Sequence, residues 1–461
     1  MREALMSLRL VFASEYNSLM KVRTRMAPSP TGELHVGGLR TALYDFAWAK
    51  KHDGQFVLRI EDTDRERQVI GATERLLEVF RDYGLSWDEG PFLQSERLPI
   101  YQKYAEELVT KGHAYYCTCT KQRLEQLRKA QQETGQLPRY DRHCRELGLK
   151  KTEEPYVIRL KVPDNEEIVF VDVVRGEIKT NSSTIDDQVL LKSDGFPTYH
   201  LAVVVDDYLM EITHVIRANE WISSTPKHVL LYKFLGWELP QFIHLSIFLD
   251  PEGDGKMSKR KGAVSARSFL EAGYLPEAML NYLMLLGWNP GTERELFTLS
   301  EFIEAFDLKD LNKSNQKFTF EKLNWFNQQY IRALDDVTLA QRLKDFTKQN
   351  EVEIAKTLPL VKERMVTLKD FDQLTEYFWQ LPKAKVENKA FLEHAIVVLE
   401  KNWDGKVLEE KAREFCAENN IRVGDYFMTL RVAITGKTTT PPLWEVMEVL
   451  GKKETIGRLK Q

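Results

Sequence analysis

Two loops in this sequence carry residue types that suit the binding of phosphate. The first holds Ser29, Gly32, His35 and Gly37 between a short apolar run and an amphipathic segment. Glycines let backbone N–H groups approach an anion, a helix N-terminus adds positive potential, and an imidazole can hydrogen-bond a phosphoryl oxygen. Taken alone, this loop is equally well explained as a glycine- and proline-rich turn with a surface histidine.

The second loop is basic and follows a predicted strand far downstream. It reads Lys256-Met257-Ser258-Lys259-Arg260-Lys261 and comes directly after a Gly253-Asp254-Gly255 turn. Basic runs are usually solvated surface. A loop at the carboxyl end of a parallel strand could instead fold over the same phosphates, where ammonium groups would stabilise the charge on departing pyrophosphate. The pair of loops is therefore more specific than either loop alone.

The elements that position the first loop read as a strand, a helix and a second strand. Residues 22–26 and 55–60 are the predicted strands. Between them, apolar residues recur at helical spacing over residues 39–47, and Gly54 ends the helix. Such a unit has a right-handed crossover and holds its ligand beyond the carboxyl ends of the strands.

A second unit of the same kind precedes the basic loop. Strands are predicted over residues 214–217 and 242–247, and Thr225 and Pro226 are predicted as the N-cap and first residue of the helix between them. The intervening residues, about 101–192, mix strand-like and helical runs, which indicates an inserted domain. Beyond residue 330 the pattern is almost wholly helical, with amphipathic runs at 339–346, 390–399 and 408–415.

Composition excludes several classes of protein. The 461 residues include 43% apolar, 11% aromatic and 29% charged residues, which is typical of a globular chain and not of a disordered one. Four cysteines are too few for an oxidised scaffold, so a cytoplasmic location is predicted. The longest apolar stretches, such as residues 278–288, are too short to span a membrane. A net charge of -4 argues against a uniformly basic nucleic-acid binder.

Taken in order, the motifs resemble those of class I aminoacyl-tRNA synthetases and, more narrowly, bacterial-type glutamyl-tRNA synthetases. The matching segments are residues 25–32, 35–38, 59–64, 197–200 and 215–217, together with the basic loop. The resemblance covers residue 22 to the carboxyl end. It implies activation of L-glutamate by ATP, with Mg²⁺, followed by transfer to the terminal adenosine of tRNA(Glu).

The resemblance also implies roles for individual residues. Arg25, Ser29, Glu61, Tyr199 and Arg217 would bind the amino acid; His35, Gly37, Glu220, Leu249 and Lys259 would bind ATP; His35, Lys256 and Lys259 would be catalytic. The chemistry is consistent, because a substrate with two carboxylates suits two guanidinium groups and its ammonium suits a carboxylate. Without the motifs, a structural ion pair would be the better explanation for each of the amino-acid-binding residues.

Two positions depart from the family pattern. Gly38 stands where the first signature ends in histidine, so the imidazole role falls on His35 alone. Val203 stands where many bacterial members carry asparagine beside the amino-acid site, which removes one polar contact to the substrate.

Three cysteines in the inserted region resemble a structural zinc site of some family members. They are Cys117, Cys119 and Cys144, and the family's fourth ligand, a histidine two residues after the last cysteine, is replaced by Glu146. Glu146 or Tyr140 is the predicted fourth ligand. The alternative is a cluster of three reduced, packed thiols.

The predicted fold is an α/β Rossmann-like catalytic domain with an inserted α+β domain, followed by an all-α anticodon-binding region. The predicted parts are an extension (1–20), catalytic halves (21–100 and 193–262), an acceptor-end-binding insertion (101–192), a connecting stem-contact domain (263–330) and the helical domain (331–461). The helical end disfavours a glutaminyl-tRNA synthetase, which carries β-barrels there. The phosphate-handling residues disfavour a non-catalytic tRNA-binding paralogue. A monomer is expected.

Overall fold

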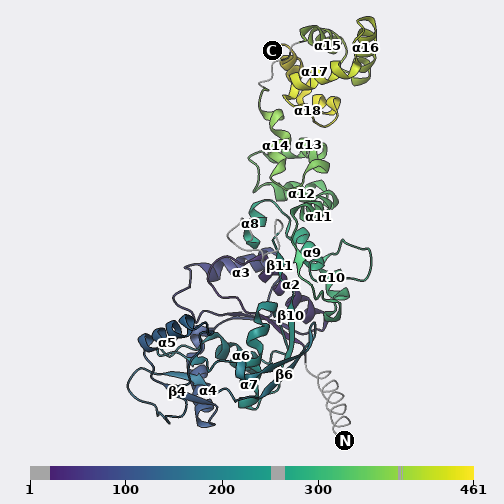
Figure 1. Cartoon of the computed structure of the whole chain (residues 1–461). Helices are drawn as coiled ribbons and strands as arrows, with labels where there is room; N and C mark the ends of the chain where they lie inside the picture. Colours follow the sequence, from purple (N-terminus) through teal and green to yellow (C-terminus); the bar gives the residue numbers. More distant parts are fainter. Residues whose placement is uncertain (1–20, 251–264, 383–385, 387) are drawn as a thin grey trace. The chain divides into compact units, whose positions relative to one another are not determined.

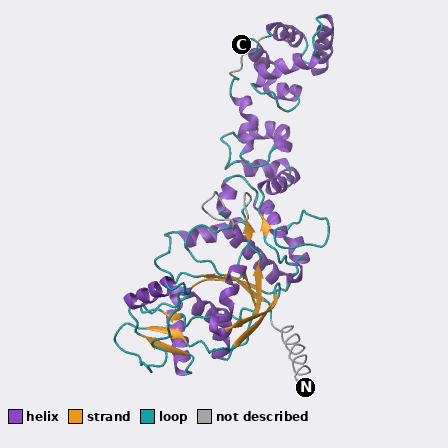
Figure 2. Ribbon diagram, viewed as in Figure 1, coloured by secondary structure: helices purple, strands orange, loops and turns teal. Residues whose placement is uncertain are grey.

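The computed structural model describes residues 21–250, 265–382, 386 and 388–461, which divide into two compact units. The first unit comprises residues 21–268 and 280–319, and the second comprises 269–279 and 320–461. Figure 1 follows the chain by colour, and Figure 2 shows that the strands of the described residues belong to the first unit. The extension 1–20 and the basic loop, with Lys256 and Lys259, lie outside the described residues.

The first unit is built on a largely parallel sheet with two hydrogen-bonded parts. The parts adjoin through the strand at one edge of each. One part has the parallel order β1 (Arg23–Met26), β2 (Gln55–Ile60), β3 (Glu89–Leu93). The other has the order β7 (Gly176–Asn181), β6 (Glu167–Asp172), β10 (Gln241–Leu245), β9 (His214–Ala218), with β7 antiparallel to β6. The N–H of Thr213 donates to the carbonyl of Arg23 at 3.0 Å, so β1 and β9 adjoin. Strand order reverses at this junction, where open α/β sheets hold ligands.

Helices cover both faces of this sheet. On β1, the hydroxyl of Thr24 donates at 2.7 Å to the carbonyl of Asp45 in α2 (Val36–Lys51), whereas Arg25 reaches Asp207 of α6 (Tyr199–Leu209) at 3.1 Å. Because successive strand residues point to opposite faces, α2 and α6 lie on opposite faces, and α7 (Thr225–Leu235) packs beside α6. The catalytic fold is therefore doubly wound, as the sequence predicts.

The helix α2 is the one that the apolar spacing predicts. Leu39 and Leu43 on its apolar face are fully buried. The helix ends at Lys51, and the chain turns at Gly54, where a Cβ would lie 2.0 Å from the carbonyl oxygen of Val22. Only glycine lets the chain pass this close on its way back to β2.

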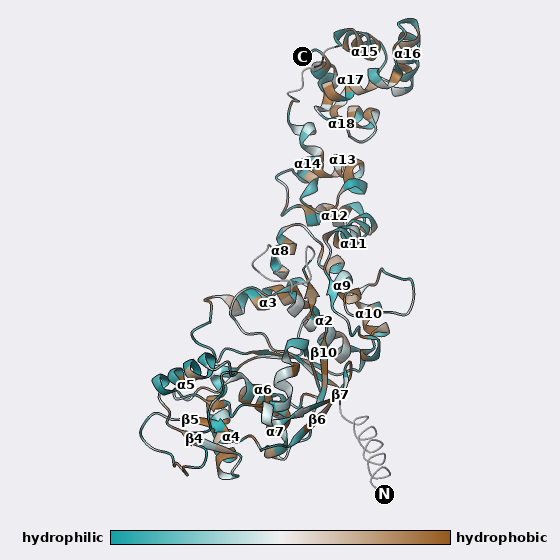
Figure 3. Ribbon diagram, viewed as in Figure 1, coloured by the Kyte–Doolittle hydropathy of each residue, from teal (hydrophilic) through white to brown (hydrophobic). Residues whose placement is uncertain are grey.

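Only part of residues 101–192 forms a sheet of its own, so the predicted inserted domain does not take up the whole range. An antiparallel sheet, β4 (Ala114–Cys117), β5 (Val157–Leu160), β8 (Val189–Leu191), accompanies α4 (Leu98–Thr110) and α5 (Lys121–Glu133). The strands β6 and β7 fall in the same range, yet they belong to the main sheet. The helix α5 has no buried residue, and Figure 3 shows it as hydrophilic along its length. The other described elements of this unit are α3 (Ala72–Asp82), α10 (Leu299–Ala305), β11 (Phe248–Leu249) and β12 (Gln316–Lys317).

The second unit is helical in its described residues. Its helices are α11 (Phe320–Ala333), α12 (Asp336–Leu343), α13 (Glu351–Val361), α14 (Asp370–Trp379), α15 (Lys389–Lys401), α16 (Gly405–Glu418), α17 (Val423–Thr435) and α18 (Leu443–Leu459); α8 (Ala266–Glu271) and α9 (Pro276–Leu285) cross the division. The three amphipathic runs predicted here correspond to α12, α15 and α16, although α12 ends before Phe346. No helix of the described residues is long and apolar enough to cross a membrane.

Candidate active site

A cavity of about 1360 Å³ lies in the first unit, where β1 and β9 end. Eight of the predicted site residues line it: Arg25, Ser29, His35, Gly37, Glu61, Tyr199, Arg217 and Glu220. Leu249 is not among the lining residues, but its neighbour Phe248 is. The fold therefore brings these predicted residues, which are up to 195 positions apart in the sequence, into one cavity.

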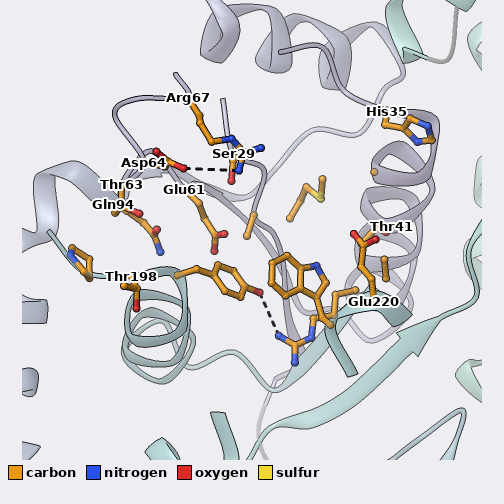
Figure 4. Close-up of a pocket in the computed structure, with 18 of the residues that line it drawn as sticks. Ser29, His35, Thr41, Glu61, Thr63, Asp64, Arg67, Gln94, Thr198 and Glu220 are labelled. Atoms are coloured by element: carbon orange, nitrogen blue, oxygen red, sulfur yellow. Dashed lines mark hydrogen bonds and ion pairs between the residues drawn. The ribbon is translucent and has the colours of Figure 1, made fainter. Parts of the chain in front are cut away.

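The cavity has two chemically different sides. Figure 4 shows Ser29 and Glu61 on one side, and His35, Thr41 and Glu220 on the other. The second side includes the first turn of α2, whose N-terminus carries positive potential. One side is thus suited to a small charged substrate and the other to phosphate.

His35 is the N-cap of α2, and its ring orientation is fixed by the backbone. Its Nδ1 accepts a hydrogen bond from the N–H of Gly37 at 3.0 Å. A Cβ on Gly37 would lie 3.2 Å from that same nitrogen, so glycine leaves room for the ring. Because Nδ1 is an acceptor, the proton of the neutral imidazole resides on Nε2.

A cluster of charged side chains is buried beneath the first side of the cavity. Arg59 is fully buried and donates to Asp207 at 2.8 Å and to Glu61 at 3.1 Å. Arg25 also donates to Asp207, at 3.1 Å, and to the carbonyl of Ile216 at 3.2 Å. Asp207 therefore holds two guanidinium groups, and Arg59 holds two carboxylates.

The pKa values in this cluster follow from burial and charge together. Burial raises the pKa of Glu61, against the opposing charges of Arg59 and Arg25. Burial acts in the same direction on Asp207, but the two guanidinium groups outweigh it and its pKa is lowered. For Arg25, burial acts to lower the pKa, but the charges of Asp207 and Asp45 together outweigh it, so the pKa of Arg25 is raised.

Arg217 has a different environment from Arg25. Its Nε donates to Nε2 of His244 at 3.0 Å, and its terminal nitrogens contact Tyr199 Oη (3.4 Å), His228 Nδ1 (3.2 Å) and Thr225 Oγ1 (2.8 Å). Burial lowers the pKa of Arg217, and it also lowers the pKa values of His228 and His244. Among the described residues, every hydrogen-bond partner of this guanidinium is therefore an uncharged group.

The N-cap prediction for α7 is wrong by one residue, and the reason lies in this site. The helix begins at Thr225, and Ser224 is its N-cap. Thr225 already has helical backbone angles (φ -57°, ψ -39°), and its hydroxyl contacts Arg217 and the carbonyl of Trp221. The Thr225 hydroxyl, which could cap a helix, thus accepts a hydrogen bond from Arg217 instead.

The helix α6 connects the two arginines. Tyr199, Val203 and Asp207 are four residues apart and so share one helix face. Tyr199 contacts Arg217, and Asp207 contacts Arg25. Val203, one helical turn from each of these two residues, is buried. Val203 leaves this face without a polar group between the two contacts.

The three cysteines of the inserted region lie together. Ligand atoms of Cys117, Cys119 and Cys144 all lie within 4.8 Å of one another. The hydroxyl of Tyr140 lies 3.3 Å from Cys117 Sγ and 3.5 Å from Cys119 Sγ. Glu146 instead forms ion pairs with Arg145 (3.4 Å) and Lys161 (3.2 Å) and is exposed. The structure therefore brings Tyr140 to the cluster and leaves Glu146 outside it.

Sequence reasoning missed several residues that shape the site. They are Arg40, Arg59, Asp206, Asp207, Thr225, His228 and His244. One signal was available: the pair Asp206-Asp207 interrupts the apolar run of α6, where buried carboxylates need partners. Arg40 lines the cavity, and burial lowers its pKa to about 10.

Comparison with known proteins identifies the family. The family model "tRNA synthetases class I (E and Q), catalytic domain" matches residues 21–325, and an anticodon-binding-domain model matches residues 338–461. The chain is 41% identical to a glutamate–tRNA ligase of Clostridioides difficile strain 630, over 95% of this chain and 98% of the relative. The chain belongs to the glutamate–tRNA ligase family.

Other members of the glutamate–tRNA ligase family match over similar lengths. The relative from Dehalococcoides mccartyi strain 195 is 43% identical over 95% of this chain and 97% of its own length. A crystal structure of a glutamate tRNA ligase from Elizabethkingia meningosepticum, in complex with its amino acid, superposes with a TM-score of 0.87 at 34% identity. That match covers 96% of this chain and 99% of the other.

Proposed function

We propose that this glutamate–tRNA ligase family member activates L-glutamate with ATP in the cavity of its first unit and transfers the glutamyl group to the terminal adenosine of tRNA(Glu). The observation that carries the substrate assignment is Arg217, a buried guanidinium at the cavity wall with uncharged partners. A buried cation of this kind is stabilised by an anionic ligand. Glu61 on the same cavity offers the opposite charge for an ammonium group.

The amino acid is held by charge at both of its ends. Arg217 and Arg25 bind the side-chain carboxylate, and Tyr199 orients Arg217 through its hydroxyl. Glu61 and Ser29 bind the ammonium group. The α-carboxylate then faces the nucleotide, where its oxygen attacks the α-phosphorus of ATP and pyrophosphate leaves.

ATP binds on the α2 side of the cavity. His35 and Gly37 contact phosphate at the helix N-terminus, and Glu220 and Leu249 contact the nucleoside. Lys256 and Lys259 of the basic loop, outside the described residues, stabilise the leaving pyrophosphate. Mg²⁺ bound to ATP would neutralise part of the phosphate charge.

The tRNA contacts both parts of the chain. Residues 101–192 bind the acceptor end: Lys121, at the first turn of the exposed helix α5, lines the cavity. The helix also carries Arg123, Arg128 and Lys129, which suit phosphate contacts. Residues 263–330 contact the stem and residues 331–461 read the anticodon. The enzyme acts as a cytoplasmic monomer.

The cysteine cluster holds a structural Zn²⁺. Tetrahedral thiolates at about 2.3 Å from zinc are about 3.7 Å apart, and Cys119 Sγ lies 3.5 Å from Cys144 Sγ. Tyr140 would supply the fourth ligand through its phenol oxygen, and the guanidinium of Arg159, 3.8 Å over its ring, would favour the electron-rich phenolate. The metal would cross-link the end of β4, the turn between β4 and α5, and the loop that holds Tyr140 and Cys144, and so stabilise this region.

Metal analysis of protein purified without chelator should find about one zinc per chain. Cys144→Ser should lose the metal, because two thiolates and an oxygen bind zinc weakly. Cys416→Ser is the matched control, since Cys416 is a buried thiol of the second unit. Glu146→Ala should also retain zinc. Metal-free wild-type protein with full stability would establish the cysteines as packed thiols.

The charging assay tests the proposed function. Purified tRNA(Glu) should accept labelled glutamate, and activation should favour glutamate over glutamine by roughly 10³ in catalytic efficiency. An amide would turn an NH₂ donor toward guanidinium groups that only donate and that cannot deprotonate. Equal activation of glutamine would refute the assignment of Arg217 and Arg25 to the side-chain carboxylate. Failure to charge any tRNA(Glu) would refute the function itself.

A further inference from the structure

Three residues form a row across neighbouring strands of the main sheet. Asp172 ends β6, His244 lies in β10, and Arg217 lies in β9. His244 and Arg217 are register partners in the parallel pair β10–β9, and Phe242 of β10 is the register partner of Asp172. The side chains of Asp172 and His244 are fully buried, and neither residue lines the cavity.

Asp172 determines which nitrogen of His244 carries the proton. Its Oδ2 accepts from His244 Nδ1 at 2.7 Å and from the His244 backbone N–H at 3.0 Å. Its Oδ1 accepts from the backbone N–H groups of Val174 (3.0 Å) and Arg175 (2.8 Å). A carboxylate with four such contacts acts only as an acceptor, so Nδ1 of His244 must donate.

The lone pair of His244 Nε2 is therefore turned toward Arg217. It accepts from Nε of the guanidinium at 3.0 Å. The opposite tautomer would present a proton there and face the Nε–H of Arg217 with a second donor. His228 Nδ1 accepts from the same guanidinium at 3.2 Å, and His228 Nε2 lies 3.0 Å from Nδ1 of His200.

We propose that Asp172 and His244 are positioning residues that hold the guanidinium of Arg217 in its binding orientation without neutralising its charge. The inference rests on the proposed role of Arg217 in binding glutamate. A carboxylate placed directly against Arg217 would compensate its charge, as Asp207 does for Arg25, and would compete with an anionic substrate. An imidazole between the acid and the arginine fixes the geometry while the positive charge stays available for the substrate.

Variants of His244 separate positioning from stability. His244→Leu removes the acceptor and should raise KM for glutamate about 20-fold, with KM for ATP changed less than about 2-fold. His244→Gln places an amide oxygen near the position of Nε2 and should bring KM for glutamate back to within about 3-fold of wild type. Both are measured by ATP–pyrophosphate exchange in the presence of tRNA(Glu).

Asp172→Asn provides a test that keeps His244 itself in place. An amide NH₂ turned to His244 would move the imidazole proton to Nε2, so KM for glutamate should rise about 5-fold or more. This variant decides the matter if His244→Leu does not fold. The matched control is His214→Leu, because His214 is a buried histidine at the opposite end of β9 whose ring makes an edge-to-face contact with Trp48. It should leave both KM values unchanged.

The outcomes are distinguishable. Wild-type protein without glutamate-dependent exchange would refute the proposed function. Active wild type, with glutamate KM values of Asp172→Asn and His244→Leu within about 2-fold of it, would refute the positioning role alone. An equal rise in KM for His214→Leu would do the same, since it would trace the effect to loss of packing.

Discussion

Arg217→Gln should lower kcat/KM for glutamate by about 10³ in ATP–pyrophosphate exchange, with little change in KM for ATP. The guanidinium of Arg217 is buried, and its four hydrogen-bond partners among the described residues are uncharged. Under the proposed function the substrate carboxylate is its main counter-charge, and losing one partner of a buried charge pair costs about 2 to 5 kcal/mol, or roughly 30-fold to 4000-fold.

Arg25→Gln is the matched comparison for this prediction. Arg25 also lines the cavity, but Asp207 already compensates its charge. Its loss should therefore reduce kcat/KM for glutamate less than the loss of Arg217, by about 10-fold to 100-fold. A larger loss for Arg25→Gln than for Arg217→Gln would contradict the ranking and move the main carboxylate contact to Arg25.

The fold was largely predictable because its signals are local. The spacing of Leu39 and Leu43 along one helix face predicts α2, and Gly54 marks the turn that follows. The strand β2 spans the predicted residues, and β1 begins one residue later than predicted. Boundaries were less predictable at Thr225, because a hydroxyl that can cap a helix can also bind a guanidinium.

The strand β6 shows that a local pattern can predict a strand without predicting its pairing partner. Its residues alternate between buried and exposed, which predicts a strand with one open face but not the sheet that it joins. It lies in the sequence range of the inserted region, yet it pairs with β10 of the main sheet. Pairing partners across about 70 residues depend on tertiary packing, which periodicity does not encode.

The residues that line the cavity were easier to predict than the residues that hold them in place. Arg25, Glu61 and Arg217 belong to motifs, and all three line the cavity. Asp172 and His244 belong to no motif, and their roles depend on strand register and on a histidine tautomer. Those are properties of the assembled sheet, so residue types and spacing alone do not reveal them.

The role of Arg59 also depends on the assembled fold and could not be predicted from residue types and spacing. It is fully buried one strand away from Arg25, and it contacts Glu61 and Asp207 directly, with Asp206 at 3.8 Å. Asp206 is further held by Gln94, Arg97 and Tyr101 at 2.9, 2.8 and 2.7 Å. A single guanidinium thus compensates charge on Glu61, which directly follows β2 and lines the cavity, and on the two aspartates of α6.

Arg59→Met should lower the free energy of unfolding of the first unit by on the order of 3 to 5 kcal/mol, because it removes a buried cation that Glu61, Asp206 and Asp207 share. Burial already raises the pKa of Glu61, and losing Arg59 should raise it further. A carboxyl with a raised folded-state pKa binds protons more readily when folded, so the deficit should shrink as pH falls from 8 to 6. Thermal melts across this pH range measure the loss of stability. Arg97→Met is the control, because Arg97 is partly exposed and Asp206 would keep its hydrogen bonds from Gln94 and Tyr101. A deficit in Arg59→Met no larger than that of Arg97→Met, or one independent of pH, would show that Arg59 does not compensate these carboxylates.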